Sequence, residues 1–207
     1  KAGAVLGYLN IIVKNLVNLV YTPMLLAFVG QADYGVYQTA NSFVFSLTLL
    51  TFGFSEAYIR FYTQEKAKGD ECDIRRLNGM YLMLYIVVCT VALSLGLLFS
   101  ANVATFFAGS FTSEQVGLAG ELMAIMSFNV AATLFSTVFD AYILAHEQFK
   151  FQQSRQMFTS LATPGVAFVL LNVGMGAVGV ASAQLAVTLT LLVLNARFAI
   201  VKLGMKF

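Results

Sequence analysis

Six long apolar runs constrain the fold of this chain more than any other feature of its sequence. Each run holds about 20 residues, the length of α-helix that crosses a hydrocarbon layer about 30 Å thick. Hydrophobic residues make up 59% of the 207-residue chain and charged residues only 11%, whereas soluble domains usually carry about 25% charged residues. The runs do not alternate with polar residues, which favours helices over a membrane β-barrel. The sequence therefore predicts an all-α, polytopic transmembrane helix bundle with about six spanning helices.

The charged residues between the runs predict how the chain is oriented. We expect the spans at about 5–29, 36–60, 78–100, 117–144, 156–173 and 177–200. The links near 30–35, 100–116 and 174–176 contain no lysine or arginine. The links near 62–77 and 146–155 and the tail after 197 contain Lys66, Lys68, Arg75, Arg76, Lys150, Arg155, Lys202 and Lys206. Because positive loops stay in the cytoplasm, both termini of this segment are predicted to be cytoplasmic.

The first span carries a polar stripe. Asn10, Lys14 and Asn18 recur every four residues, so they share one face of a helix. Lys14 lies roughly 14 Å into the span by helical rise, and ionisable groups at such a depth usually face a bundle interior or a wet cavity. Lys14 could instead snorkel to the inner interface along its aliphatic stem, but Asn18 is too short to do so. Pro23 removes a backbone donor and predicts either a hinge or a static kink.

The second span offers polar residues near each end. Asn41 lies near the outer end, between other polar residues. Glu56 and Arg60 are four residues apart near the inner end, where they can form an ion pair. Such a pair is either part of a functional groove or an interfacial contact of little energetic consequence.

The fourth span carries a second polar stripe on one helical face, consisting of Asn129, Thr133, Ser136, Thr137 and Asp140. Serine and threonine can bond to their own backbone, so they are weak indicators of a cavity. Asn129 and Asp140 are stronger indicators of a cavity. Asp140 is either an interfacial carboxylate at the helix end or the partner of Lys14 or Arg60, acting as a gate latch or an ion-coupling carboxylate.

The last two spans are expected to be structural. Thr163-Pro164-Gly165 should break the fifth span early, and Asn195 and Arg197 should lie at the inner interface. His146 is expected to begin a solvated loop and to take no part in function.

A resemblance appears where the first span meets the second. Tyr21-Thr22-Pro23, then Gly30, then Asp33-Tyr34-Gly35-Val36-Tyr37 and a long second span resemble the opening of the bacterial polysaccharide flippase family. These are the Wzx-like O-antigen and capsule exporters, in the superfamily of the peptidoglycan-precursor flippase and the MATE drug exporters. The helix order, loop lengths and inside-positive loops extend the likeness across all 207 residues.

The resemblance implies a function, a location and partners. Such proteins carry lipid-linked sugars across the bacterial inner membrane by alternating access between two six-helix lobes, and residues 1–207 resemble the amino-terminal lobe. The implied substrate is an undecaprenyl-diphosphate-linked oligosaccharide, and the implied partners are the lipid bilayer, a polysaccharide polymerase and glycosyltransferases. The first residue is Lys, so we expect a segment of a longer chain whose second lobe is missing; a six-helix chain that acts as a dimer is the alternative.

The residues contain no motif for enzymatic chemistry. There is no nucleophile-and-base set, phosphate loop or metal-ligand spacing, so we expect no enzyme, cofactor or metal. We also expect no nucleic-acid binding, because the basic residues are confined to short loops. The flippase hypothesis assigns substrate binding to Lys14, Asn18, Asn41, Arg60, Asn129 and Asp140. The alternatives are MATE-type export of drug cations, which needs a dominantly acidic cavity, and a membrane scaffold that transports nothing.

Overall fold

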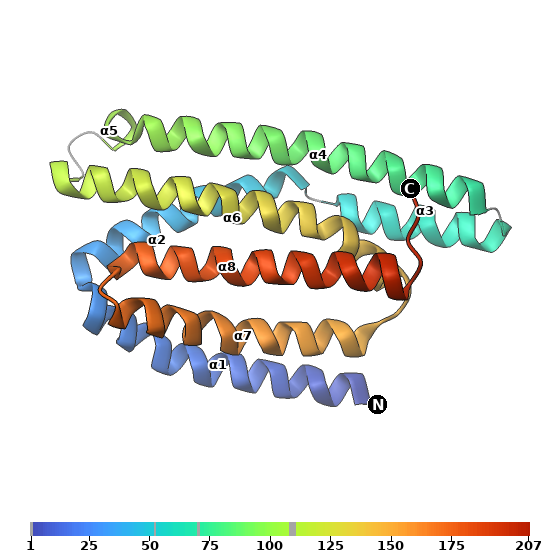
Figure 1. Cartoon of the computed structure of the whole chain (residues 1–207), viewed down its shortest axis with the longest axis horizontal. Coiled ribbons are helices and arrows are strands. Elements are labelled where there is room, and N and C mark those ends of the chain that lie inside the picture. The colour runs from blue at the N-terminus through green and yellow to red at the C-terminus, as the bar shows by residue number, and fades with distance from the viewer. Residues whose placement is uncertain (1, 52, 70, 108–110) are drawn as a thin grey trace.

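The described part of the chain is built from helices. The computed structural model describes residues 2–51, 53–69, 71–107 and 111–207, with side chains from residue 7 onward, and these residues form no strand (Figure 1). The α-helices are α1 Ala2–Val29, α2 Gln31–Phe45, α3 Phe54–Lys68, α4 Glu71–Ala101, α5 Val103–Phe106, α6 Ser113–Ala145, α7 Phe149–Asn172 and α8 Gly176–Arg197. A 3-10 helix, η1 (Ser46–Thr51), follows α2, and a π-helical turn, η2 (Phe198–Lys202), follows α8. The predicted all-α class is confirmed.

Membrane-spanning character is shared by most of the long helices. Five segments of the described chain are long and apolar enough to cross a membrane: Gly7–Val29, Gln31–Lys68, Glu71–Ala101, Ser113–Ala145 and Gly176–Lys202. The remaining expected span, 156–173, corresponds to the greater part of α7, which begins earlier than expected, at Phe149, and ends at Asn172. The polar side chains of α7 distinguish it from the five segments named above. Pro164 lies inside α7, which continues to Asn172, so the predicted early break is wrong.

The second expected span, 36–60, is a broken helix rather than a continuous one. It comprises part of α2, all of η1 and part of α3. The hydroxyl groups of Ser46, Thr48 and Thr51 each donate to the carbonyl three residues earlier, at 2.6, 2.7 and 2.9 Å. Gly53 then adopts a φ of 83° before α3 begins. Such local side-chain bonds compete with the α-helical ladder, and a positive φ ends a helix.

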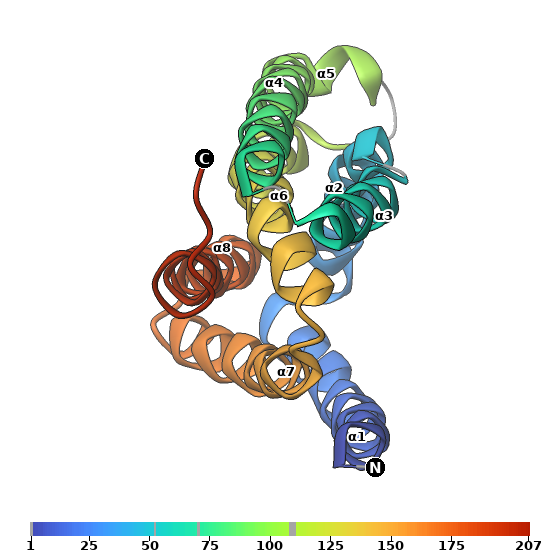
Figure 2. The ribbon, with the colours of Figure 1, turned by 90° about the vertical axis from the view of Figure 1, so that its right-hand side faces the viewer.

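The helices lie along one long axis, with α6 in the middle (Figure 1). The helix α6 packs against α4, α8, α2 and α3, whereas α1 packs mainly on α7, and α7 on α8 (Figure 2). The α3–α4 link, the α6–α7 link and both chain ends lie at the same end of the bundle (Figure 1). The basic links therefore share one end, as a positive-inside topology requires.

The helices α4 and α6 approach each other closely at Gly96. A Cβ atom on Gly96 would lie 2.1 Å from Ser127 Oγ and 2.7 Å from Ser127 Cβ, and Ser127 is fully buried. We expect Gly96→Ala to lower the free energy of unfolding by about 1–3 kcal/mol, because overpacking forces the helices apart. Thermal unfolding in detergent measures the effect. Gly79→Ala is the matched control on α4, because nothing lies within 4 Å of its added Cβ. Equal melting temperatures for the two variants would contradict this packing.

Candidate functional site

A cleft of about 910 Å³ lies between α1, α6, α7 and α8. Most of the side chains that line it bear a polar group, and Ile11, Pro164 and Leu191 are its aliphatic members. Its amide, hydroxyl and charged side chains are Tyr8, Asn10, Lys14, Asn18, Tyr21, Thr133, Ser136, Thr137, Asp140, Gln153, Arg155, Gln156, Thr159, Ser160, Thr163, Gln184, Thr188 and Asn195. Such a concentration of polar groups inside a bundle of apolar helices indicates a wet cavity.

The α1 wall of the cleft contains the predicted polar stripe. Asn10 is 6% exposed. Its Nδ2 donates to the backbone carbonyl and to Oε1 of Gln153, both at 3.1 Å, and to Gln156 Oε1 at 3.3 Å. Asn10 thereby ties α1 to α7. Lys14 and Asn18 follow one and two turns later, are exposed, and line the same cleft. The shared face is confirmed, whereas substrate binding by Lys14 and Asn18 stays a prediction.

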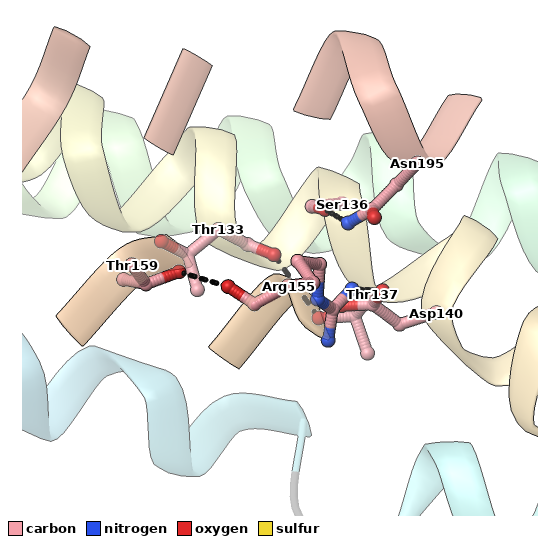
Figure 3. A network of polar contacts seen from close by, with 7 residues as sticks. All are labelled: Thr133, Ser136, Thr137, Asp140, Arg155, Thr159 and Asn195. Atoms are coloured by element: carbon pink, nitrogen blue, oxygen red, sulfur yellow. Dashed lines mark hydrogen bonds and ion pairs between the residues drawn. The ribbon is translucent and has the colours of Figure 1, made fainter. Parts of the chain in front are cut away.

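An ion pair joins α6 to α7 across the cleft. Arg155 Nη1 donates to Asp140 Oδ1 (Figure 3), and the two side chains are 16% and 30% exposed. The expectation that Asp140 pairs with Lys14 or Arg60 is therefore wrong. Since α7 packs mainly on α1 and α8 and touches α6 at few residues, this ion pair is a principal link between α6 and α7.

Polar atoms on the α8 and α1 walls of the cleft lack a hydrogen-bond partner among the described residues. Asn195 is 1% exposed, and its Nδ2 donates to Ser136 Oγ at 2.8 Å (Figure 3). Asn195 Oδ1, Gln184 Oε1 and Tyr21 Oη are buried without a hydrogen-bond partner among the described residues, and all three residues line the cleft. A buried acceptor without a donor costs about 1–3 kcal/mol. These atoms are therefore suited to accept hydrogen bonds from water or from a polar ligand.

A smaller pocket of about 270 Å³ extends the polar surface toward α2. Asn41 and Asn129 line it, and Thr133 and Gln184 line both this pocket and the cleft. The predicted residues Asn41 and Asn129 thus lie beside the cleft rather than in it. Asn129 Oδ1 has no hydrogen-bond partner within the described ranges.

Two predicted site residues lie outside both the cleft and the smaller pocket. Arg60 is exposed on α3, and neither pocket lining includes it. Pro23 is exposed on α1, which continues through it to Val29. Its assignment as a hinge stays a prediction.

Sequence reasoning missed the contribution of α7 and α8 to the cleft. The lining residues of α7 include Arg155, Thr159 and Thr163, which recur every four residues. On α8, Gln184 and Thr188 are also four residues apart. The same periodicity that revealed the α1 stripe was therefore present in both helices.

The charged side chains of the cleft give it a small positive excess. Lys14 and Arg155 are cationic and Asp140 is anionic, so the lining carries a net charge of +1. In the described ranges, no group of three His, Cys, Asp or Glu residues could hold a metal ion. No family model, curated protein or solved structure matches the chain. Its function is therefore inferred from the chemistry of the cleft.

Proposed function

We propose that this chain is one lobe of a membrane transporter that moves lipid-linked oligosaccharide or polysaccharide precursors across the bacterial inner membrane by alternating access. The observation that carries the proposal is the polar cleft among apolar helices. A polar surface at membrane depth typically belongs to a substrate pathway. In this proposal a second lobe completes the pathway, and rocking of the lobes exposes the cleft to either side.

The lining of the cleft suits a headgroup that is both anionic and rich in hydroxyl groups. Lys14 provides a point charge that suits a phosphate or diphosphate. The unpaired acceptors Gln184 Oε1 and Asn195 Oδ1 suit the hydroxyl donors of a sugar. Beside these groups, α1 exposes the apolar side chains of Leu16 and Leu19. The lipid tail can therefore stay in the bilayer while the headgroup occupies the cleft.

The resemblance of the first two spans to polysaccharide flippases supplies the rest of the proposal. The substrate carrier is then of the undecaprenyl-diphosphate type, and a polysaccharide polymerase and glycosyltransferases act before and after transport. MATE-type export of drug cations is the weaker alternative, because the cleft lining has a net charge of +1 and a cationic drug calls for an acidic cavity.

Complementation tests the proposal. The full-length parent protein is expressed in hosts that lack their own O-antigen flippase and differ in the sugar they export, and surface polysaccharide is measured. Two variants at adjacent positions of α8 distinguish the effect of filling the cleft from the effect of enlarging a side chain on the exposed surface. Thr188→Phe fills the cleft, whereas Leu189→Phe enlarges a side chain that is exposed and outside the cleft lining.

We expect the parent and Leu189→Phe to restore surface polysaccharide and Thr188→Phe to fail, with all three present in the membrane at equal amounts. Absence of restoration by a well-expressed parent across the host panel would contradict the flippase proposal. Increased drug resistance in the same cells would then favour the drug-export alternative.

A further inference from the structure

A cluster of aromatic side chains lies at the end of the bundle where α6 meets α7, apart from the cleft. His146 caps α6 and is partly buried, so its expected place in a solvated loop is wrong. Its ring centroid lies 4.3 Å from that of Tyr142 on α6 and 5.3 Å from that of Tyr62 on α3. The cluster continues through Tyr58, which stacks on Tyr62 with centroids 5.9 Å apart.

The hydrogen bonds of His146 determine which ring nitrogen carries the proton. Nδ1 lies 2.9 Å from the backbone carbonyl of Tyr142, and a carbonyl can only accept, so Nδ1 is the protonated nitrogen. Nε2 of the neutral ring is then an acceptor, and Tyr62 Oη donates to it at 3.0 Å. A second proton on His146 would turn Nε2 into a donor and would remove the acceptor that Tyr62 uses.

The same cluster holds the segment that follows α8. Tyr142 Oη donates to the carbonyl of Leu203 at 3.3 Å. Asn78 of α4 is 1% exposed, and its Nδ2 donates to the carbonyl of Lys206 at 2.8 Å. Met205, between the two, is 3% exposed. Figure 1 shows this segment passing from the end of α8 toward α4. Its docking therefore anchors α8, one wall of the cleft.

The surroundings of His146 disfavour a charged ring. The titratable and charged groups that face it are Tyr62 and Lys66 of α3 and Tyr142 of α6, and no ion pair joins it to a carboxylate among the described residues. Burial, and then the charge of Lys66, lower the pKa of His146 below its usual value, against the opposing effect of its hydrogen bond to the Tyr142 carbonyl.

We propose that Tyr62, Tyr142 and His146 form a pH-sensitive latch, which holds the segment 203–206 against α4 and α6 while His146 is neutral and loosens it when His146 is protonated. The latch does not depend on what the cleft transports. In this proposal the docked segment favours the neutral ring, so docking is fully stabilised at pH values above the pKa that His146 has in the undocked state. That stabilisation is lost progressively as the pH falls through the undocked pKa toward the docked one.

The latch can be tested by cysteine labelling of the docked segment. Met205→Cys is introduced together with Cys89→Ala, so that the exposed Cys72 serves as the reference in the same molecule. A disulfide reagent that reacts in mild acid is applied between about pH 8 and about pH 5, the range in which a histidine titrates. Mass spectrometry then gives the ratio of the labelling rates at 205 and 72. His146→Gln is the control, because glutamine keeps polar contacts and does not titrate.

We expect the labelling ratio to rise by about threefold or more on acidification in the Met205→Cys/Cys89→Ala protein and to stay flat when His146→Gln is added to it. Tyr142→Phe keeps the ring but removes the donor to Leu203, so it should raise the ratio already at the higher pH. A flat ratio in the Met205→Cys/Cys89→Ala protein, or an equal rise after His146→Gln is added, would overturn the proposal.

Discussion

Replacing Arg155 by alanine should lower the free energy of unfolding by about 1–3 kcal/mol, because it leaves the Asp140 carboxylate without its cation. This loss is smaller than the about 3–5 kcal/mol expected for breaking a fully buried ion pair, since the Asp140 side chain is 30% exposed and water can partly solvate it. The variant also removes a principal link between α6 and α7. Thermal unfolding of the purified protein in detergent would show the loss as a lower melting temperature.

A double-mutant cycle measures the coupling energy between Asp140 and Arg155 separately from the effect of each residue on its own. Asp140→Asn leaves Arg155 unpaired, and we expect it to destabilise as well. The second single variant of the cycle is Arg155→Gln, which leaves Asp140 unpaired. The double variant Asp140→Asn with Arg155→Gln places two neutral amides together, so its loss should be smaller than the sum of the losses of these two single variants. Lys150→Ala, at an exposed position of the same helix, controls for the loss of a positive charge. Strict additivity in the cycle would show that the pair contributes no coupling energy.

The sequence predicted the fold class and the α1 wall of the cleft because both depend on simple periodicities. Apolar runs of spanning length require helices in a bilayer. A four-residue spacing places Asn10, Lys14 and Asn18 on one face, and all three line the cleft. The stripe on α6 was predicted in the same way, and Ser136 and Asp140 also line the cleft.

The α7 wall was not predicted, because a polar side chain that faces a cleft cannot be told from one that faces water by its type alone. Gln153 and Arg155 precede the expected start of the fifth span at residue 156 and were assigned to a solvated link. In the structure α7 already begins at Phe149. Pro164 was expected to break the span, but a membrane helix can continue through a proline when neighbouring groups compensate for the lost donor.

The predicted partner of Asp140 was wrong for a related reason. Periodicity shows which residues of one helix share a face, but it does not show which helices are neighbours. The predicted partners of Asp140, Lys14 and Arg60, lie on the first and second spans. Arg155, which the sequence places in the predicted link 146–155, was not among these predicted partners, although it lies opposite Asp140 in the structure.

In the flippase proposal, Lys14→Ala should reduce export of lipid-linked sugar by about tenfold or more while the protein still inserts into the membrane. Lys14 lines the cleft, and no carboxylate pairs with it among the described residues. Its charge is therefore available to a ligand anion. A hydrogen bond to a charged group contributes about 1.5–3 kcal/mol, which corresponds to roughly a 10- to 150-fold change in affinity.

Two variants distinguish ligand binding from membrane anchoring by Lys14. Lys14→Arg keeps the positive charge and should retain most export. Asn15→Ala changes the next residue, which is exposed and outside the cleft lining, and should export normally. Surface polysaccharide normalised to the amount of membrane-inserted protein is the measurement. If Lys14 only snorkels to the interface, Lys14→Ala will insert less well or behave like the parent, and export per inserted molecule will not change. Anchoring by Lys14 would affect only how much protein inserts into the membrane. If Lys14→Ala lowers export per inserted molecule and leaves insertion unchanged, the positive charge must therefore act in the cleft.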